Sequence, residues 1–153
     1  MSFASPRLWI AYMKDKSNKT SRKGGRKFCP TQAPVYRQTE MLLAWAVPVV
    51  DSLPKSLAAQ TMGRKIIEDI MESLDAISLA LIAEKGEARL ELINILDVRL
   101  TSVRTALRTL VGMKMGVSPK QQSQYIGMLA NISGSVAKWR NANTCTNGQG
   151  CEV

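Results

Sequence analysis

The chain has 153 residues, 45% of them hydrophobic, which suffices for one domain with a core and argues against a wholly disordered chain. Its formal net charge is +9, and it contains no histidine. The positive charge favours anionic partners such as RNA, DNA or an anionic membrane surface, whereas the absence of histidine removes the usual general base and the commonest metal ligand. We therefore expect no enzyme activity, no cofactor and no metal site.

The first 34 residues carry most of the charge, with eight Lys or Arg side chains and one Asp. They show no apolar periodicity, and we predict a disordered basic arm over residues 1–34. The alternative, that the natural protein starts at Met13 or later, remains open. Residues 35–153 are almost balanced, with 13 basic and 11 acidic side chains.

The rest of the chain has apolar residues at helical spacing, which predicts four helices. We expect them over about residues 36–53, 57–84, 87–114 and 119–140. Their apolar stripes are formed, in chain order, by Leu42, Ala46, Val49 and Leu53; by Ile67, Ile70, Leu74, Ile77 and Leu81; by Ile93, Leu96, Leu100, Val103, Leu107 and Leu110; and by Tyr125, Met128, Ile132, Val136 and Trp139. No segment alternates with a period of two, so we expect no strands.

Turn and cap residues separate these helices. Pro54 divides the first two, and either Ser56 or Thr61 is expected to cap the second. Gly86 is expected as a left-handed cap ending the second helix, and Gly116 as the end of the third. Residues 118–121, Ser-Pro-Lys-Gln, have the pattern of a capping box with proline at the first helical position. Pro48 is expected to kink the first helix or to shift its start.

Connections of a few residues make neighbouring helices antiparallel, so we predict an up-down-up-down four-helix bundle over residues 35–140. The second and third helices would each be about 40 Å long and would extend past the first. Because of this overhang, we expect another subunit to cover part of their apolar surface. The polar residues 141–153 are predicted to be a disordered tail.

The cysteines and the apolar runs indicate in which cellular compartment we expect the protein. The three cysteines, Cys29, Cys145 and Cys151, lie in the arm and the tail, which favours a reducing cytoplasm, although a Cys145–Cys151 disulfide remains an alternative. The longest uncharged apolar run, Leu42–Val50, contains a proline and is too short to span a membrane. We expect a cytoplasmic protein without membrane contact.

The basic side chains on the predicted helices are the candidate binding residues, because arginine pairs with phosphate or carboxylate through two parallel hydrogen bonds. Arg104 and Arg108 lie one turn apart on the third helix and are the strongest candidates. The supporting candidates are Lys55, Arg64, Lys65, Arg99 and Lys114. Two alternatives remain open: the arginines of the third helix form an ordinary solvated face, or they pair with the acidic residues of the second helix, which are Glu68, Asp69, Glu72 and Asp75. The tryptophans Trp45 and Trp139 fall on apolar stripes and are expected to pack in the core.

Several short segments occur in a particular order. The apolar run Leu42–Pro48 precedes the turn Leu53–Ser56, and Met62–Ile66 opens the second helix. Val103–Arg108 places two arginines on the third helix, and Ile132–Trp139 ends the fourth. Together these segments resemble the accessory variability determinant (Avd) family of diversity-generating retroelements. The chain departs from the family at residues 137–138, Ala-Lys, where the family has a glycine pair.

The resemblance implies a non-catalytic four-helix protein that forms a homopentamer and binds the retroelement's reverse transcriptase with its template RNA or cDNA. It also implies a bacterial, archaeal or phage-encoded protein. The four-helix proteins encoded in intervening sequences of 23S ribosomal RNA genes share this architecture and are the alternative. A helical toxin–antitoxin, regulatory or generic interaction module is a third class. A neighbouring transcriptase gene or ribosomal RNA gene would distinguish these classes.

Overall fold

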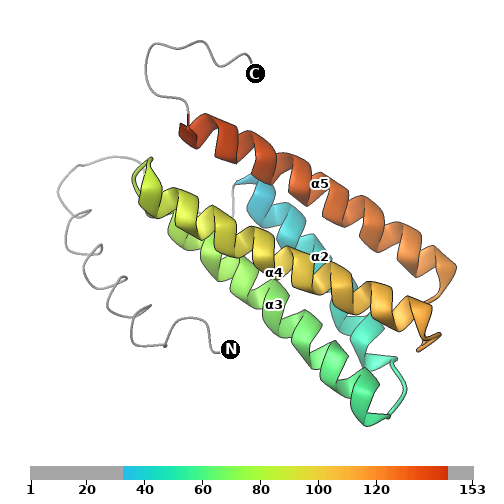
Figure 1. Ribbon diagram of the computed structural model, residues 1–153. Coiled ribbons are helices and arrows are strands. Elements are labelled where there is room, and N and C mark those ends of the chain that lie inside the picture. Colours follow the sequence, from blue (N-terminus) through green and yellow to red (C-terminus); the bar gives the residue numbers. More distant parts are fainter. Residues whose placement is uncertain (1–32, 145–153) are drawn as a thin grey trace.

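The computed structural model describes residues 33–144, which form four α-helices joined by short connections. The helices are α2 (Pro34–Asp51), α3 (Leu57–Ile82), α4 (Glu87–Gly112) and α5 (Pro119–Thr144). Each helix packs against its neighbour in the chain, and α5 closes the ring against α2 (Figure 1). The expected all-α, antiparallel four-helix bundle is therefore confirmed, and no strand occurs between residues 33 and 144.

The two ends of the described chain differ from the predicted domain boundaries. The expected basic arm lies outside the described residues except for its last two, and one of these, Pro34, already begins α2. At the other end α5 continues to Thr144, so the prediction that the tail starts at residue 141 is wrong by one turn. The side chain of Asn143 explains the extra turn, because its Nδ2 donates to the carbonyl of Gly86 and its Oδ1 accepts from the Gly86 amide, both at 3.1 Å.

The predicted helix starts are confirmed in detail. Ser56 caps α3, and its hydroxyl accepts from the Ala59 amide at 3.2 Å, whereas the alternative cap Thr61 lies inside the helix. The capping box before α5 is complete: the Gln121 amide donates to the Ser118 hydroxyl at 3.2 Å, and the Ser118 amide donates to Gln121 Oε1 at 2.9 Å. These bonds satisfy amides that a helix leaves without partners in its first turn.

Two glycines that were expected to end helices behave differently from expectation. Gly86 has φ of +129° but precedes α4 as its N-cap, while α3 has already ended with an extended Ala83 as its C-cap. Gly116 has φ of +85° and lies in the α4–α5 connection, because α4 ends at Gly112. Pro48 lies inside α2 and does not shift its start, which is Pro34.

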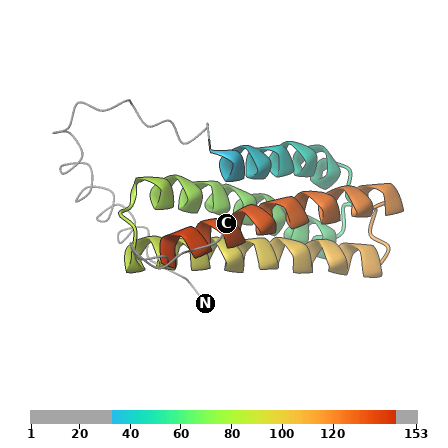
Figure 2. The ribbon, with the colours of Figure 1, turned by 90° about the horizontal axis from the view of Figure 1, so that it is seen from above.

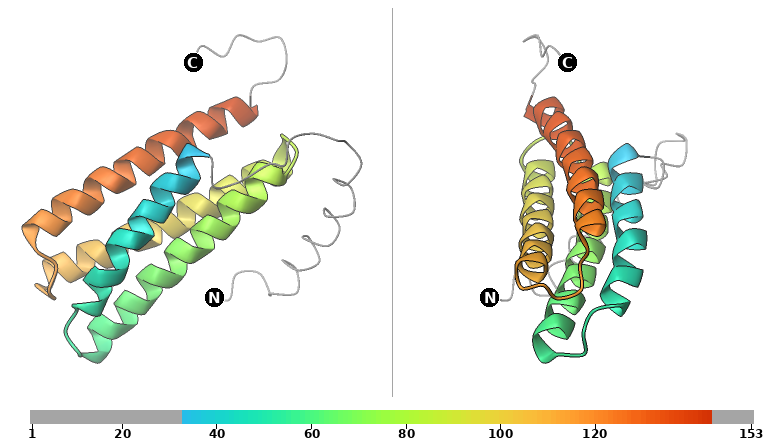
Figure 3. Two further views of the ribbon diagram at one scale, coloured as in Figure 1. Left: turned by 180° about the vertical axis from the view of Figure 1, so that it is seen from behind. Right: turned by 90° about the vertical axis from the view of Figure 1, so that its right-hand side faces the viewer.

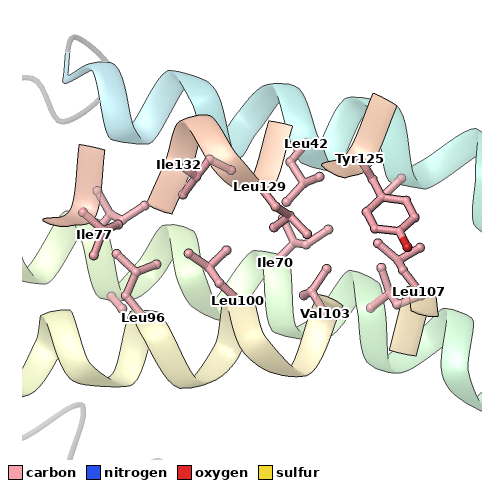
Figure 4. Packing of buried hydrophobic residues seen from close by; sticks show 14 of the residues in the cluster. Leu42, Ile70, Ile77, Leu96, Leu100, Val103, Leu107, Tyr125, Leu129 and Ile132 are labelled. Atoms are coloured by element: carbon pink, nitrogen blue, oxygen red, sulfur yellow. The ribbon is translucent and has the colours of Figure 1, made fainter. Parts of the chain in front are cut away.

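The core runs along the bundle axis and draws on all four helices (Figure 4). The predicted stripes of α2 and α4 are buried throughout. Of the stripe predicted for α3, Ile70 and Ile77 are buried. Its other residues, Ile67, Leu74 and Leu81, are partly exposed at the edge of the buried face. The buried face of α3 instead includes the small or polar residues Gly63, Asp69 and Ser73. On α5, Met128 and Trp139 are partly exposed, and Leu129 is an additional buried residue.

The first helix is shorter than the others, as predicted: α2 has 18 residues and α3, α4 and α5 have 26 each (Figure 2). However, the chain itself covers most of the overhang. A second small cluster of Leu79, Ala80, Ala83 and Leu92 is buried there against Ile95 and Trp139. The overhang therefore requires no second subunit, and only Ile82, at 46% exposure, remains a large exposed apolar side chain of that region.

The described chain enters and leaves the bundle at the same end. The start of α2 and the end of α5 both lie toward the α3–α4 turn, away from the other two connections (Figure 3). The hydrogen bonds between Asn143 and Gly86 join α5 to that turn. The opposite end carries the α2–α3 and α4–α5 connections, which touch each other, because a Cβ at Gly116 would lie 3.3 Å from Pro54 Cδ.

Candidate nucleic-acid and partner interface

Two of the predicted binding residues take part in an ion-pair cluster between α3 and α4. Arg99 Nη1 lies 3.4 Å from Asp69 Oδ1, and Arg99 Nε lies 2.7 Å from Glu72 Oε2. Lys65 Nζ lies 2.8 Å from the same Asp69 oxygen. The Asp69 side chain has no exposed area, whereas Lys65 and Glu72 are each 48% exposed. Arg99 and Lys65 therefore pair with carboxylates of α3.

The arginines Arg104 and Arg108 are not part of that cluster. Both are exposed on α4. The Arg104 guanidinium donates to the hydroxyl of Ser133 on α5 at 3.4 Å, which places it on the edge of α4 opposite to Arg99. Arg108 forms no hydrogen bond or ion pair with any residue that the structure describes. Of the two alternatives for these arginines, pairing with the acidic residues of α3 does not occur, whereas a solvated face remains open.

The other candidates are Lys55, Arg64 and Lys114, all exposed. Lys55 lies in the α2–α3 connection and Lys114 in the α4–α5 connection, so the fold brings them to the same end of the bundle. Lys114 has a left-handed backbone, with φ of +53°. Arg64 lies on α3, apart from the other two. The seven predicted residues therefore do not form one site: Lys65 and Arg99 belong to the α3–α4 ion pairs, and Arg104, Arg108 and Lys114 follow the second half of α4.

Sequence reasoning missed how sharply the charges separate along the chain. Residues 38–97 contain five basic and ten acidic side chains, whereas residues 98–144 contain seven basic and none that is acidic. The second half of α4 and all of α5 are thus cationic without any carboxylate of their own. A count by segment, instead of a comparison of the arm with the remainder, would have revealed this pattern.

Three basic residues of this acid-free segment were not among the candidates: Lys120, Lys138 and Arg140. Lys120 and Lys138 are exposed on α5. Arg140 forms an ion pair with Asp97 of α4 and also donates to Asn94 Oδ1 at 3.0 Å. Asp97, the last acidic residue before the segment, is therefore already paired with Arg140. Within the described residues, no carboxylate then competes with an anionic partner for Arg104 and Arg108.

The tryptophans pack as expected, but neither is completely buried. Trp45 lies against Tyr125, with ring centroids 5.9 Å apart, and its Nε1 donates to Gln124 Oε1 at 3.0 Å. Trp139 packs against both apolar clusters. These rings are engaged between α2 and α5 or at the end of the bundle. Helix α4, which carries Arg104 and Arg108, contains no aromatic residue.

A shallow cleft of about 370 Å³ lies where α2 begins, lined by Ala33, Pro34, Val35, Leu81, Ser135, Lys138 and Trp139. Its walls are mainly apolar, and Lys138 is the only ionisable side chain among them. Within residues 33–144, no three Asp, Glu or Cys side chains gather as metal ligands would. None of the described helices has the length and apolar character needed to cross a membrane.

Comparison with family models, curated proteins and solved structures gives no significant match.

Proposed function

We propose that this protein is a non-catalytic accessory subunit that binds nucleic acid and a protein partner. The observation that carries the proposal is the acid-free segment 98–144, with seven basic side chains on two neighbouring helices. On that segment Arg104 and Arg108 are exposed, and neither pairs with a carboxylate of residues 33–144. An anionic polymer gains most from such a surface, because each neutralised phosphate releases counterions.

The partners in this proposal come from the resemblance to the accessory variability determinant family. They are a reverse transcriptase of a diversity-generating retroelement and its template RNA or cDNA, with the accessory protein acting as a homo-oligomer, as a pentamer in that family. The four-helix bundle and the cationic surface of α4 and α5 support this role, since positioning a polymerase and its template needs charge and shape but no catalytic group.

The test is the double substitution Arg104→Ala and Arg108→Ala. We expect it to lower transcriptase co-precipitation and RNA affinity while the melting temperature stays within a few degrees, because neither arginine pairs with a carboxylate. The RNA affinity of the unsubstituted protein should fall steeply as the salt concentration rises. A control, Lys85→Ala, removes the charge of an exposed lysine in the acid-rich part of the chain that is not among the candidate residues, and it should leave both kinds of binding unchanged. Loss of stability with unchanged binding of both partners would refute the proposal.

A further inference from the structure

Three threonines form a row on the outer surface of α4. Thr101, Thr105 and Thr109 recur every four residues, so they lie above one another on one face of the helix, and all three are exposed. Each hydroxyl donates to the backbone carbonyl four residues earlier, at 2.8 Å for Thr101 and 2.9 Å for the other two. A hydroxyl has a single proton, and each of these threonines uses it in the bond to the carbonyl. Any further hydrogen bond to these hydroxyls must therefore be one that they accept.

Arg104 and Arg108, which pair with no carboxylate of the described helices, adjoin this row. Arg104 follows Thr101 by three residues and Arg108 follows Thr105 by three, which makes them neighbours on the helix surface. A guanidinium has five N–H donors and no acceptor. Arg104 uses one donor on Ser133, and Arg108 uses none within the described chain. The surface therefore presents a row of pure donors beside a row of pure acceptors, which we call the Arg–Thr face (Thr101, Arg104, Thr105, Arg108 and Thr109).

This combination distinguishes between nucleic acids. A phosphate accepts hydrogen bonds and matches the arginines, but it has nothing to donate to the threonines. The ribose 2′-hydroxyl can donate, and it lies beside the phosphates along the backbone of RNA and is absent from DNA. The arrangement of donors and acceptors on this surface thus matches an RNA backbone better than a DNA backbone.

The surroundings of the Arg–Thr face favour a double helix over a single strand. Single-stranded nucleic acids are held largely by stacking of bases on aromatic rings. Helix α4 has no aromatic residue, and the aromatic rings within residues 33–144, Tyr36, Trp45, Tyr125 and Trp139, lie on α2 and α5 and pack against the core. Double-stranded RNA is recognised instead through its phosphates and 2′-hydroxyls, without contact to base faces. Asp97, the acidic residue nearest in sequence, is already paired with Arg140.

We propose that the Arg–Thr face binds the sugar–phosphate backbone of an RNA double helix, with the arginines on phosphates and the threonine hydroxyls accepting from 2′-hydroxyls. This inference rests on the proposed nucleic-acid binding function and adds to it the class of ligand and the mode of recognition. Because base edges are not contacted, the binding does not depend on the sequence of the stem.

The experiment compares three probes on the full-length chain: an RNA duplex of about 16 base pairs, a DNA duplex of the same sequence, and an unstructured single-stranded RNA. The central variant replaces Thr101, Thr105 and Thr109 by valine, which keeps the branched shape and the charge but removes the acceptor oxygens. A matched control replaces the same three residues by serine, which retains the hydroxyls. Because every variant keeps residues 1–34, any binding by the basic arm is common to all of them.

We expect the unsubstituted protein to bind the RNA duplex at least about fivefold more tightly than the DNA duplex. This ratio of affinities corresponds to the free energy of one net hydrogen bond. The valine variant should bind both duplexes equally, with DNA affinity unchanged, and the serine variant should retain the preference. Arg104→Ala with Arg108→Ala should weaken both duplexes and lower the slope of log affinity against log salt by about 2.

Equal affinity of the unsubstituted protein for the two duplexes would overturn the inference. A preference that survives in the valine variant, or tighter binding of the single strand, would do the same. In these cases the proposed function would still stand, because nucleic acid is bound. If none of the three probes binds to the unsubstituted protein, the nucleic-acid part of the proposed function fails together with the inference.

Discussion

Arg99 differs from the other surface arginines because one of its partners is a fully buried carboxylate. Asp69 has no exposed area, and its Oδ2 atom has no hydrogen-bond partner among the described residues. All compensation of this buried charge therefore comes through Oδ1, from Arg99 and Lys65. A buried charge that loses a partner costs far more than an exposed one, because water cannot replace the lost interaction.

At this site we predict that Arg99→Ala lowers the free energy of unfolding by about 2 kcal/mol, in the range for hydrogen bonds to charged groups. Glu72→Ala should cost less than about 1 kcal/mol, because that carboxylate is half exposed and its pair with Arg99 is screened by solvent. Urea denaturation of both variants provides the measurement. Equal effects of the two substitutions would mean that Asp69 does not depend on Arg99.

At the scale of single helices, glycine has two opposite roles in this fold. Gly63 lies where α3 meets α2, and a Cβ there would be 2.8 Å from Val50 Cγ1 and 3.0 Å from Leu53 Cδ1. Gly127 lies on α5, and a Cβ at that position would have no neighbour within 4 Å. The first glycine allows close packing of two helices, whereas the second only lowers the helix propensity of α5.

We therefore predict opposite signs for the same substitution in these two helices. Gly63→Ala should lower the free energy of unfolding by about 1 kcal/mol, because overpacking against Val50 exceeds the gain in helix propensity. Gly127→Ala should raise it by about 0.8 kcal/mol, since only the propensity changes. Chemical denaturation of the two variants, side by side, tests both. Stabilisation by Gly63→Ala would show that α2 and α3 can separate without cost.

The helices also show which features the sequence could and could not predict. The stripe of α4 was predictable because its buried positions are all large and aliphatic. On α3 the adjacent Ile66 and Ile67 allow two choices of face, and the buried Asp69 and Ser73 carry no hydrophobic signal. The last turn of α5 was not predicted, because Asn143 is polar and the sequence does not show that its side chain bonds to Gly86.

The sequence alone could suggest the candidate binding residues, but it could not show which of them lie on the same surface. Arg99 and Arg104 lie five residues apart, which places them on different edges of one helix. Their neighbours decide their roles: Arg99 faces the carboxylates of α3, and Arg104 faces a serine on α5. Knowledge of which helix lies on each side of α4 requires the fold.

For the whole molecule, the homo-oligomer is a prediction that rests on the resemblance and on the surface of the bundle. Large apolar side chains are exposed on every helix, namely Met41, Val47, Leu57, Met71, Ile82, Val98, Met113 and Ile126. We expect light scattering at micromolar concentration to give a multiple of the 16.8 kDa chain mass, and the family that the sequence resembles would make this multiple five. Treatment with nuclease and high salt beforehand serves as the control, and a monomer mass after it would contradict the prediction.

An even number of antiparallel helices returns the chain to the end from which it started, beside the α3–α4 turn. In the proposed homo-oligomer, if the bundle axes are parallel, the start of α2 and the end of α5 of every copy would therefore lie at the same rim. The opposite rim would carry only the short connections with Lys55 and Lys114. Such a particle is polar, because one rim carries the start of α2 and the end of α5 of every copy and the other rim carries Lys55 and Lys114. A label on Thr144 would then mark a single rim of the particle.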